Sequence, residues 1–329
     1  PPLSHSAQRY CGTPSPTPVH RRLATDTKAT ANPQLERHDL EIMNRTIDEM
    51  FAADRMFAPY RNIRKVTCFG SARIKEDDPS YKLAQEFSRL AVEHGYMVIT
   101  GGGPGIMQAC NEGAHAAHSF GLNITLPYEQ KPNHVVEHSD KMMNFHYFFT
   151  RKLNFLKQSD ALVAFPGGFG TMDEIFETIT LMQTGKSTLF PIVLLDPPYE
   201  TFWGRWIRFI EKELLDAGLI SPEDMRLLYP CKSAASAFAC IARFYSRFHS
   251  YYFSKADVVI RIMEPLSDKL MDWIRHDFSD IMPKDDLTQE PGYARDPDPA
   301  LATLRPRRSP FRKGAYNRLR ELIDVVNDR

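Results

Sequence analysis

The chain has 329 residues, of which 43% are hydrophobic and 25% are charged, and its 41 basic residues balance 41 acidic ones. This is the composition of an ordinary globular protein with one large domain or two smaller ones. The balanced charge, and the lack of an apolar run near the ~20 residues of a membrane span, argue against binding to nucleic acid or membranes. Five cysteines without a Cys-x-x-Cys pair predict reduced thiols in a cytoplasmic protein.

Residues 1–34 are rich in Ser, Thr, Pro and Arg, and Asp26 is their only acid. We predict a flexible tail, because such a composition buries too little apolar surface to fold. Scattered arginines with few acids also occur in organelle transit segments, so import into an organelle is the alternative.

Residues 35–250 alternate short apolar runs with amphipathic segments, which is the pattern of βαβ units. The runs predicted to be parallel strands are Val66–Phe69, Tyr96–Thr100, Leu122–Leu126, Ala161–Phe165 and Phe190–Leu195. The predicted helices are Leu35–Tyr60, Tyr81–Glu93, Ile106–Ala117, a segment beginning near Thr171, Thr201–Ala217 and Ala234–Tyr245. The predicted fold class is α/β, a Rossmann-like parallel sheet with helices on both faces and an additional N-terminal helix.

Residues 251–329 are predicted to form a mostly helical extension that packs on the core or on a dimer partner. Val258–Met263 is predicted to be an extra strand, and Pro265–Phe278 and Tyr316–Val326 are predicted to be helices. The segment Met282–Pro310 is rich in proline and charge and is predicted to be irregular. The basic residues within 305–313 lack an accompanying aromatic and glycine pattern. We therefore interpret them as a solvated tail or a subunit contact rather than a nucleic-acid site.

Three glycine-containing turns follow predicted strands of the sheet, namely Gly70-Ser71, Gly101 to Gly105 and Gly167 to Thr171. The carboxyl ends of parallel strands meet at one edge of a sheet, where α/β proteins bind their ligands. We therefore expect all three turns to open onto that edge. This makes Gly70, Ser71, Gly102 and Gly103 candidate substrate-binding residues.

The segment Ala161–Thr180 combines an apolar strand, the glycine turn and an amphipathic helix. A helix that starts after such a turn presents free N–H groups, which bind anions. Glu174 and Glu177 share one face of the helix, and a phosphate site beside a carboxylate indicates chemistry on a phosphorylated sugar.

A second interpretation of the same segment is open, because Thr171 and Glu174 have the spacing of a capping box that would satisfy the free N–H groups. Three glycines in one turn favour the ligand site slightly, since close approach of a ligand to the backbone requires missing side chains.

Two other motifs resemble known binding patterns, one for NAD and one for zinc, but we interpret neither as a site of that kind. The run Gly101–Gly105 lacks the G-x-G-x-x-G spacing, and no acid stands at the expected position after the next strand. A mononucleotide phosphate or sugar therefore fits this loop better than NAD. His134–His138 matches the zinc pattern H-x-x-E-H, but the flanking periodicity is weak and no third ligand is evident, so no metal site is predicted.

The aromatic segment Asn144–Lys152 carries two adjacent cations, Arg151 and Lys152, shortly before the strand that leads into the glycine turn. One interpretation is a core helix with a solvated pair of cations. The other places Arg151 against a phosphate or a leaving group, because its planar fork suits an oxyanion.

The sequence Pro166–Glu174 resembles the P-G-G-x-G-T-x-x-E signature of the LOG-like proteins, the cytokinin riboside 5′-monophosphate phosphoribohydrolases, many of which carry the label "lysine decarboxylase". Arg151-Lys152 and Gly101-Gly102-Gly103 match as well, and the resemblance covers about Val66 to Ala237. The long C-terminal region is similar to the larger branch of the family. The first turn, Phe69–Arg73, departs from the C-G-S-S of compact members, which leaves the preferred base open.

The resemblance implies a homodimer or higher homo-oligomer that hydrolyses the N-glycosidic bond of nucleoside 5′-monophosphates without a metal or organic cofactor. Glu174 would stabilise the oxocarbenium-like ribose or activate water, and Arg151 would orient the substrate and help the leaving base. The residues that the resemblance assigns to the 5′-phosphate are Gly167, Gly168, Gly170 and Thr171. The other residues that it places at the substrate are Glu129, Lys152, Glu177 and Thr180.

The alternative from another class is a carrier or sensor that binds a nucleotide in the same turn without turnover. Arg151 and Glu174 favour the enzyme, because a carboxylate repels a phosphate and has no use in a pure binder. Decarboxylation is not expected, since no lysine stands in a recognisable pyridoxal-phosphate setting.

Overall fold

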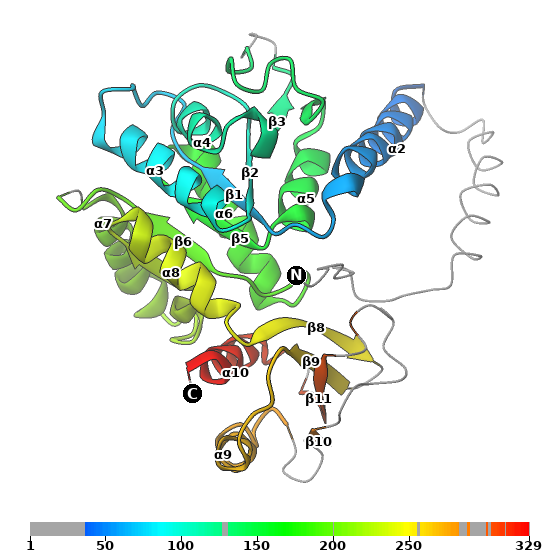
Figure 1. Cartoon of the computed structure of the whole chain (residues 1–329), viewed down its shortest axis with the longest axis vertical. Coiled ribbons are helices and arrows are strands. Elements are labelled where there is room, and N and C mark those ends of the chain that lie inside the picture. The colour runs from blue at the N-terminus through cyan, green and yellow to red at the C-terminus, as the bar shows by residue number, and fades with distance from the viewer. Residues whose placement is uncertain are drawn as a thin grey trace.

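The computed structural model of the chain describes residues 37–126, 131–199, 201–254, 257–282, 288–289, 301, 304–312 and 314–328 (Figure 1). The predicted tail at 1–34 lies outside these residues. Within them, no helix has both the length and the apolar composition that crossing a membrane requires. The four described cysteines, Cys68, Cys110, Cys231 and Cys240, are free thiols.

Seven parallel strands form the main sheet, in the spatial order β4-β3-β2-β1-β5-β6-β7. Their bounds are β1 Lys65–Phe69, β2 Met97–Thr100, β3 Ser119–Ile124, β4 Met142–Phe145, β5 Ala161–Ala164, β6 Ile192–Leu195 and β7 Leu228–Cys231. The predicted α/β class is confirmed. The order of the strands reverses between β1 and β5, which is the position where open α/β sheets bind ligands.

The two outermost strands, β4 and β7, were not predicted. Both are short and have only one buried residue among their four, so they lack the continuous apolar run that marks the inner strands. β7 also contains Pro230, which is tolerated because the strand lies at the edge of the sheet.

Alternate residues of the inner strands face opposite sides of the sheet, so an apolar core forms on each side. In β5, Leu162 and Ala164 belong to one core, while Ala161 and Val163 belong to the other. The helices with side chains in the first core are α2 Arg37–Phe57, α5 Phe148–Gln158, α6 Phe169–Gln183 and α7 Phe202–Ile210. The helices with side chains in the second core are α3 Pro79–Glu93, α4 Ile106–Ala114 and α8 Ala234–Phe244. Helices on both faces are therefore confirmed.

Local sequence explains where several helices begin. Asp78 caps α3 by accepting a hydrogen bond of 2.7 Å from Ser80 N–H, and Pro79 occupies the first turn. Ser233 and Ser236 form a reciprocal capping box at the start of α8. The remaining short helical turns are Ala58–Tyr60, Ala116–His118, Asp224–Leu227 and the π-helical turn Glu211–Leu215.

The C-terminal part of the chain forms a four-stranded antiparallel sheet and two helices, which lie below the main sheet in Figure 1. In spatial order the strands are β10 Thr288–Gln289, β11 Arg305–Pro310, β9 Asp257–Ile262 and β8 Phe248–Ser254. The helices are α9 Asp268–Asp277 and α10 Tyr316–Asp328, as predicted. The boundary predicted after residue 250 falls within β8.

The prediction that Met282–Pro310 is irregular is wrong for its last six residues, because β11 pairs with β9 from Arg305 to Pro310. The backbone of the basic stretch is thus part of a sheet rather than a solvated tail up to Pro310. The basic and proline-rich composition does not reveal this strand, because its pairing depends on β9, which lies more than forty residues earlier.

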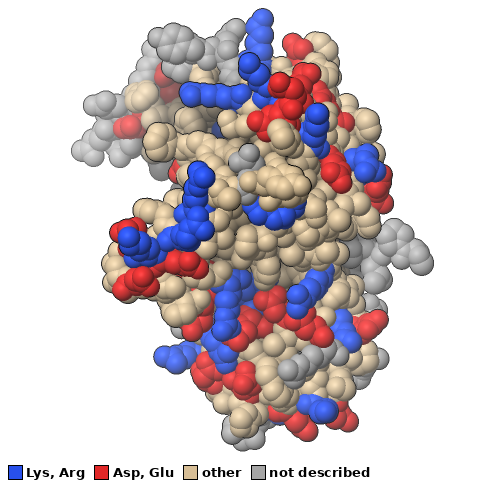
Figure 2. All heavy atoms as spheres, turned by 90° about the vertical axis from the view of Figure 1, so that its left-hand side faces the viewer, with Lys and Arg blue, Asp and Glu red and all other residues tan. Residues whose placement is uncertain are grey.

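Charges of both signs are distributed over the face shown in Figure 2, where basic and acidic side chains alternate without a large field of one sign. This distribution agrees with the formal net charge of zero. This face therefore lacks the clustered basic patch that is typical of nucleic-acid-binding surfaces.

Candidate functional site

The three glycine-containing turns meet at the carboxyl edge of the main sheet. Ser71 N–H donates a hydrogen bond of 3.1 Å to the carbonyl of Pro166, and the carbonyl of Ser71 accepts one of 3.1 Å from Ile106 N–H. The turn after β1 is thereby joined to the turn after β5 and to the start of α4. The expectation that the turns share one edge is confirmed.

Two glycines in these turns are required by close packing. A Cβ atom on Gly70 would lie 2.6 Å from the Ile106 side chain. Gly105 has a φ of +67°, and a Cβ atom there would lie 2.4 Å from the carbonyl oxygen of Ser71. Both glycines therefore hold the start of α4 against the turn after β1.

The loop after β2 is held by a buried polar network that the sequence analysis missed. Thr100 Oγ1 donates to Asn111 Oδ1 over 2.8 Å and accepts from Gly102 N–H over 2.9 Å. Asn133 donates its backbone N–H to the carbonyl of Gly102 over 2.8 Å and its amide to that of Gly103 over 3.0 Å. Gly102 and Gly103 thus lie in a rigid loop whose carbonyls are occupied by protein donors. The three partners come from separate segments, and no spacing rule connects them.

The start of α6 distinguishes the two interpretations of the Thr171–Glu174 spacing. The helix begins at Phe169, two residues earlier than predicted, with Gly168 at the cap position and no capping side chain. Its first helical hydrogen bond runs from Met172 N–H to the carbonyl of Gly168 over 3.1 Å. The capping-box interpretation is therefore wrong, and the N–H groups of residues 169–171 precede the first helical bond. Such an end is suited to an anion.

The glycines of this turn differ in what surrounds them. A Cβ atom on Gly167 would lie 2.2 Å from Thr171 Oγ1, so Gly167 is needed for the turn itself. Cβ atoms on Gly168 or Gly170 would meet no protein atom within 4 Å, and neither residue has a positive φ. Neither packing nor backbone conformation therefore requires glycine at these two positions, and the space beside them is open to a ligand.

Replacing Gly170 with Ala is expected to separate ligand binding from stability. The substitution should stabilise the fold by about 0.5–1 kcal/mol, as Ala does within helices, and should weaken binding of ribose 5-phosphate about tenfold. Gly70→Ala serves as the contrasting variant, because its Cβ atom collides with Ile106 and should destabilise the fold by about 1–3 kcal/mol. Thermal unfolding and titration calorimetry measure the two effects. Undiminished binding by Gly170→Ala would show that the ligand lies elsewhere.

Arg151 extends from α5 underneath the loop after β2. Its Nε donates a hydrogen bond of 2.7 Å to the carbonyl of Leu122, and its guanidinium lies 5.0 Å from the centre of the Phe155 ring. A Cβ atom on Gly101 would lie 2.6 Å from a terminal nitrogen of Arg151, so this glycine makes room for the guanidinium. Burial lowers the pKa of Arg151, while the charge of Glu174 raises it. Arg151 is held in place by protein contacts and is close enough to Glu174 for their charges to interact.

Glu174 is only 8% exposed, and its carboxylate accepts no hydrogen bond from any described residue. Burial raises its pKa to about 7, against the opposing effects of the positive charges of Lys152 and Arg151. A buried carboxylate that accepts no hydrogen bond from a described residue, near two cations and behind an open helix start, is a candidate for a catalytic group.

Lys152 forms ion pairs with two carboxylates of α6, at 2.7 Å with Asp173 and 2.8 Å with Glu177. The interpretation of Arg151 and Lys152 as a solvated pair is therefore wrong, because one is hydrogen-bonded to the backbone and the other is ion-paired. Glu177 is half-buried and lies on the predicted face of the helix, but it is engaged with Lys152.

One predicted substrate-binding residue, Thr180, stands apart from this arrangement. Thr180 is exposed, and its hydroxyl donates to the carbonyl of Phe176 within the same helix over 2.8 Å. Glu129 lies outside the described residues. The structure thus brings together Arg151, Glu174 and the glycine turns, and does not bring Thr180 to them.

Glu49 supports the site from a distance and was not predicted. This α2 residue is 5% exposed, and its carboxylate accepts hydrogen bonds from His146 N–H, over 2.7 Å, and from the hydroxyl of Thr150. These groups stand at the start of α5, so Glu49 fixes the helix that carries Arg151. A contact between residues 97 positions apart leaves no local pattern in the sequence.

Comparisons with known proteins identify relatives of this chain. A family described as "Possible lysine decarboxylase" matches residues 107–241. Cytokinin riboside 5′-monophosphate phosphoribohydrolase LOG2 of Arabidopsis thaliana is 27% identical over 173 residues, which cover 52% of this chain and 79% of the relative. The phosphoribohydrolase of the same name from Mycobacterium tuberculosis is 30% identical over 153 residues, which cover 45% of this chain and 77% of the relative.

Among solved structures, the molybdenum cofactor carrier protein of Chlamydomonas reinhardtii is 23% identical, covers 55% of this chain and 97% of its own, and has a TM-score of 0.38. A likeness at this level carries no argument about function. The chain is 30% identical to the mycobacterial protein over most of that protein's length, and it has the glycine turn and Arg151 as well. The chain therefore belongs to the LOG-like family.

Proposed function

We propose that the protein hydrolyses the N-glycosidic bond of nucleoside 5′-monophosphates to the free base and ribose 5-phosphate. The relatives that match are named for this type of reaction. The observation that carries the proposal is the buried carboxylate of Glu174, which lies near Arg151, has a pKa raised by burial to about 7, and accepts no hydrogen bond from a described residue.

In the proposed reaction the 5′-phosphate lies against the N–H groups at the start of α6, in the space beside Gly168 and Gly170. The ribose then lies next to Glu174. In its ionised form Glu174 stabilises the oxocarbenium-like ribose or activates a water molecule. The C1′–N bond breaks, the water oxygen bonds to C1′, and its proton leaves with the base, whose developing negative charge Arg151 offsets.

Lysine decarboxylation, to which the description of the family points, is not part of the proposal. Lys152, the lysine that follows Arg151, is held by Asp173 and Glu177. A lysine that forms a Schiff base must be able to lose its proton, whereas these two carboxylates raise the pKa of Lys152 against the effect of burial.

The test is incubation of the purified protein with AMP, CMP and isopentenyladenosine monophosphate, followed by chromatographic detection of free base. Release from at least one member of such a nucleotide panel is the expected result. Tight binding without release from any of them would overturn the proposal in favour of a nucleotide carrier or sensor.

We further propose that the protein acts as a homodimer. Apolar side chains are exposed at helical spacing on two neighbouring helices, α2 and α5. They are Met43, Ile47 and Phe51 on α2 and Phe148, Phe149 and Leu153 on α5. A second copy of the chain covers such a face in many homo-oligomers. Sedimentation velocity should show a dimer that dissociates in Phe149→Glu, and a monomeric parent protein would refute it.

A further inference from the structure

A cavity of about 840 Å³ lies at the opposite edge of the main sheet, away from the glycine turns. Most of its residues precede β1, β2 or β3 or belong to α8 and its C-terminal flank, while Met97 begins β2 and Met263 follows β9. The cavity therefore opens at the amino ends of the strands. This volume is within the range of small-molecule sites in proteins. The cavity is therefore separate from the proposed catalytic site.

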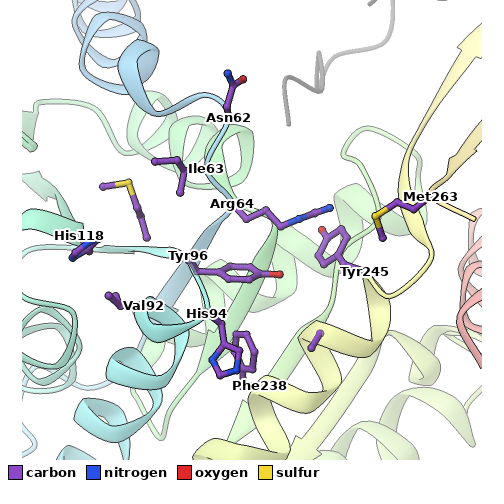
Figure 3. Close-up of a pocket in the computed structure, with 13 residues that line it drawn as sticks. Asn62, Ile63, Arg64, Val92, His94, Tyr96, His118, Phe238, Tyr245 and Met263 are labelled. Carbon is purple, nitrogen blue, oxygen red and sulfur yellow. The ribbon is translucent and has the colours of Figure 1, made fainter. Parts of the chain in front are cut away.

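The walls of this cavity are largely aromatic. Tyr96 and Phe238 are nearly buried and meet edge to face, with ring centres 5.5 Å apart. The His94 ring lies 4.4 Å from that of Phe238, and Tyr245 lies on the other side. Figure 3 shows the hydroxyl end of Tyr96 pointing toward Tyr245, with Arg64 reaching between them. Such walls favour a planar ring.

Arg64 is the one formally charged side chain among the residues that line the cavity, all of which the structure describes. Its side chain is 11% exposed, and its guanidinium stacks on Tyr245 at 3.6 Å from the ring centre. Its nearest carboxylate is Asp160, at 3.8 Å, which is too long for a hydrogen bond. Among the described residues the guanidinium donates no hydrogen bond, although it has five N–H groups.

The guanidinium nitrogens of Arg64 keep contact with solvent at the cavity, where an anionic acceptor on a ligand can replace water. Asp160 offsets part of the charge of Arg64 but is itself occupied by a hydrogen bond of 2.8 Å from Lys65 N–H. The hydroxyl of Tyr96 is a further donor beside it, because burial raises the pKa of Tyr96 to about 12 and keeps its proton in place. The polar groups of the cavity therefore supply donors on an aromatic background.

We propose that this cavity is a second ligand-binding site, which takes a small molecule with a planar ring and a carboxylate or phosphate group. The anionic group pairs with the guanidinium of Arg64, and the ring lies against Tyr96 and Phe238. A bidentate pair with the planar fork gives the site its preference for anions.

The test uses three naphthalene probes that differ in one group: 2-naphthoate, 1-naphthyl phosphate and the neutral 2-naphthalenemethanol. Calorimetry on the full chain, with the catalytic site saturated by ribose 5-phosphate, is expected to show that at least one anion binds about tenfold more tightly than the alcohol. The two anions distinguish a carboxylate ligand from a phosphate ligand. Equal binding of all three, or no binding below about 1 mM, would overturn the proposal.

Two variants locate the binding. Arg64→Gln should weaken binding of the preferred anion about tenfold, and Ala242→Trp, an exposed α8 residue at the cavity, should block it by filling the space. Thermal unfolding establishes that both variants are folded, and Arg89→Gln, an exposed arginine of α3, serves as the matched control. Binding that survives both cavity substitutions would refute the site. A crystal soaked with 6-bromo-2-naphthoate should place the carboxylate at Arg64 and the bromine within the cavity at the end of the ring away from Arg64, and bromine outside the cavity would contradict the assignment.

Discussion

Replacing Glu174 with Gln is expected to lower the rate of base release by a factor of about 10³, because the amide can neither stabilise a cationic ribose nor accept a proton from water. Affinity for ribose 5-phosphate should stay the same or rise, since a negative charge near the phosphate is removed. Steady-state kinetics and calorimetry measure the two quantities. Glu177→Gln is the matched control on the same helix, and its rate should change little, because its carboxylate is paired with Lys152.

The same substitution is expected to stabilise the protein at neutral and higher pH. The pKa of Glu174 is about 7 in the fold against 4.5 for an unperturbed glutamate, so the folded state binds its proton more tightly than the unfolded state. Its contribution to stability is therefore complete below pH 4.5 and is lost as pH rises toward 7. The loss is roughly 3 kcal/mol. Urea unfolding at pH 5 and pH 8 should show a gain from Glu174→Gln only at pH 8. If Glu174→Gln raised the free energy of unfolding at neither pH, burial would not destabilise the ionised carboxylate.

Replacing Arg151 with Met is expected to lower kcat/KM by a factor of about 10²–10³ and to move its pH dependence. In the parent protein kcat/KM should rise with a midpoint near pH 7, because Glu174 acts in its ionised form. Removing the positive charge of Arg151 raises the pKa of Glu174 further, so the midpoint should move to higher pH. The second ionisation of the substrate phosphate affects every variant alike.

Arg151→Lys tests which property of the arginine matters. Lys keeps the positive charge, so the midpoint should stay near that of the parent, but it loses the planar fork and the rate should still fall. If the midpoint in Arg151→Met were unchanged or lower, the two residues would not be coupled in the way that their positions imply.

Much of the fold could be predicted because its determinants are local. The buried inner strands have continuous apolar runs, and most glycines in the turns after β1, β2 and β5 stand where a side chain or the backbone of a neighbouring segment comes close. The edge strands β4 and β7 could not be predicted in this way, since they are half-exposed. The same holds for β11, which is basic and lies between β10 and β9. What makes them strands is the pairing with a neighbour, which sequence periodicity does not record.

The candidate site was predictable to the same extent. Arg151 and Glu174 stand in short motifs, but the capping-box alternative could be rejected only when the helix was seen to start at Phe169. The pairing of Lys152 with Asp173 and Glu177, and the role of Asn111 and Asn133 behind the glycine loop, join separate segments. Contacts of this kind depend on how the helices pack, so residue spacing alone does not reveal them.

The buried carboxylate of Glu49 has a consequence for how much of the chain the reaction requires. A fragment that begins with the first strand at Lys65 retains the glycine turns, Arg151 and Glu174, yet it lacks the acceptor that holds the beginning of α5. In such a fragment the backbone N–H of His146 and the hydroxyl of Thr150 lose their shared acceptor. The start of α5, the helix that carries Arg151, is then no longer held in place. We therefore expect the complete signature to be insufficient for the proposed activity, because α2 is also needed to hold the helix that carries Arg151.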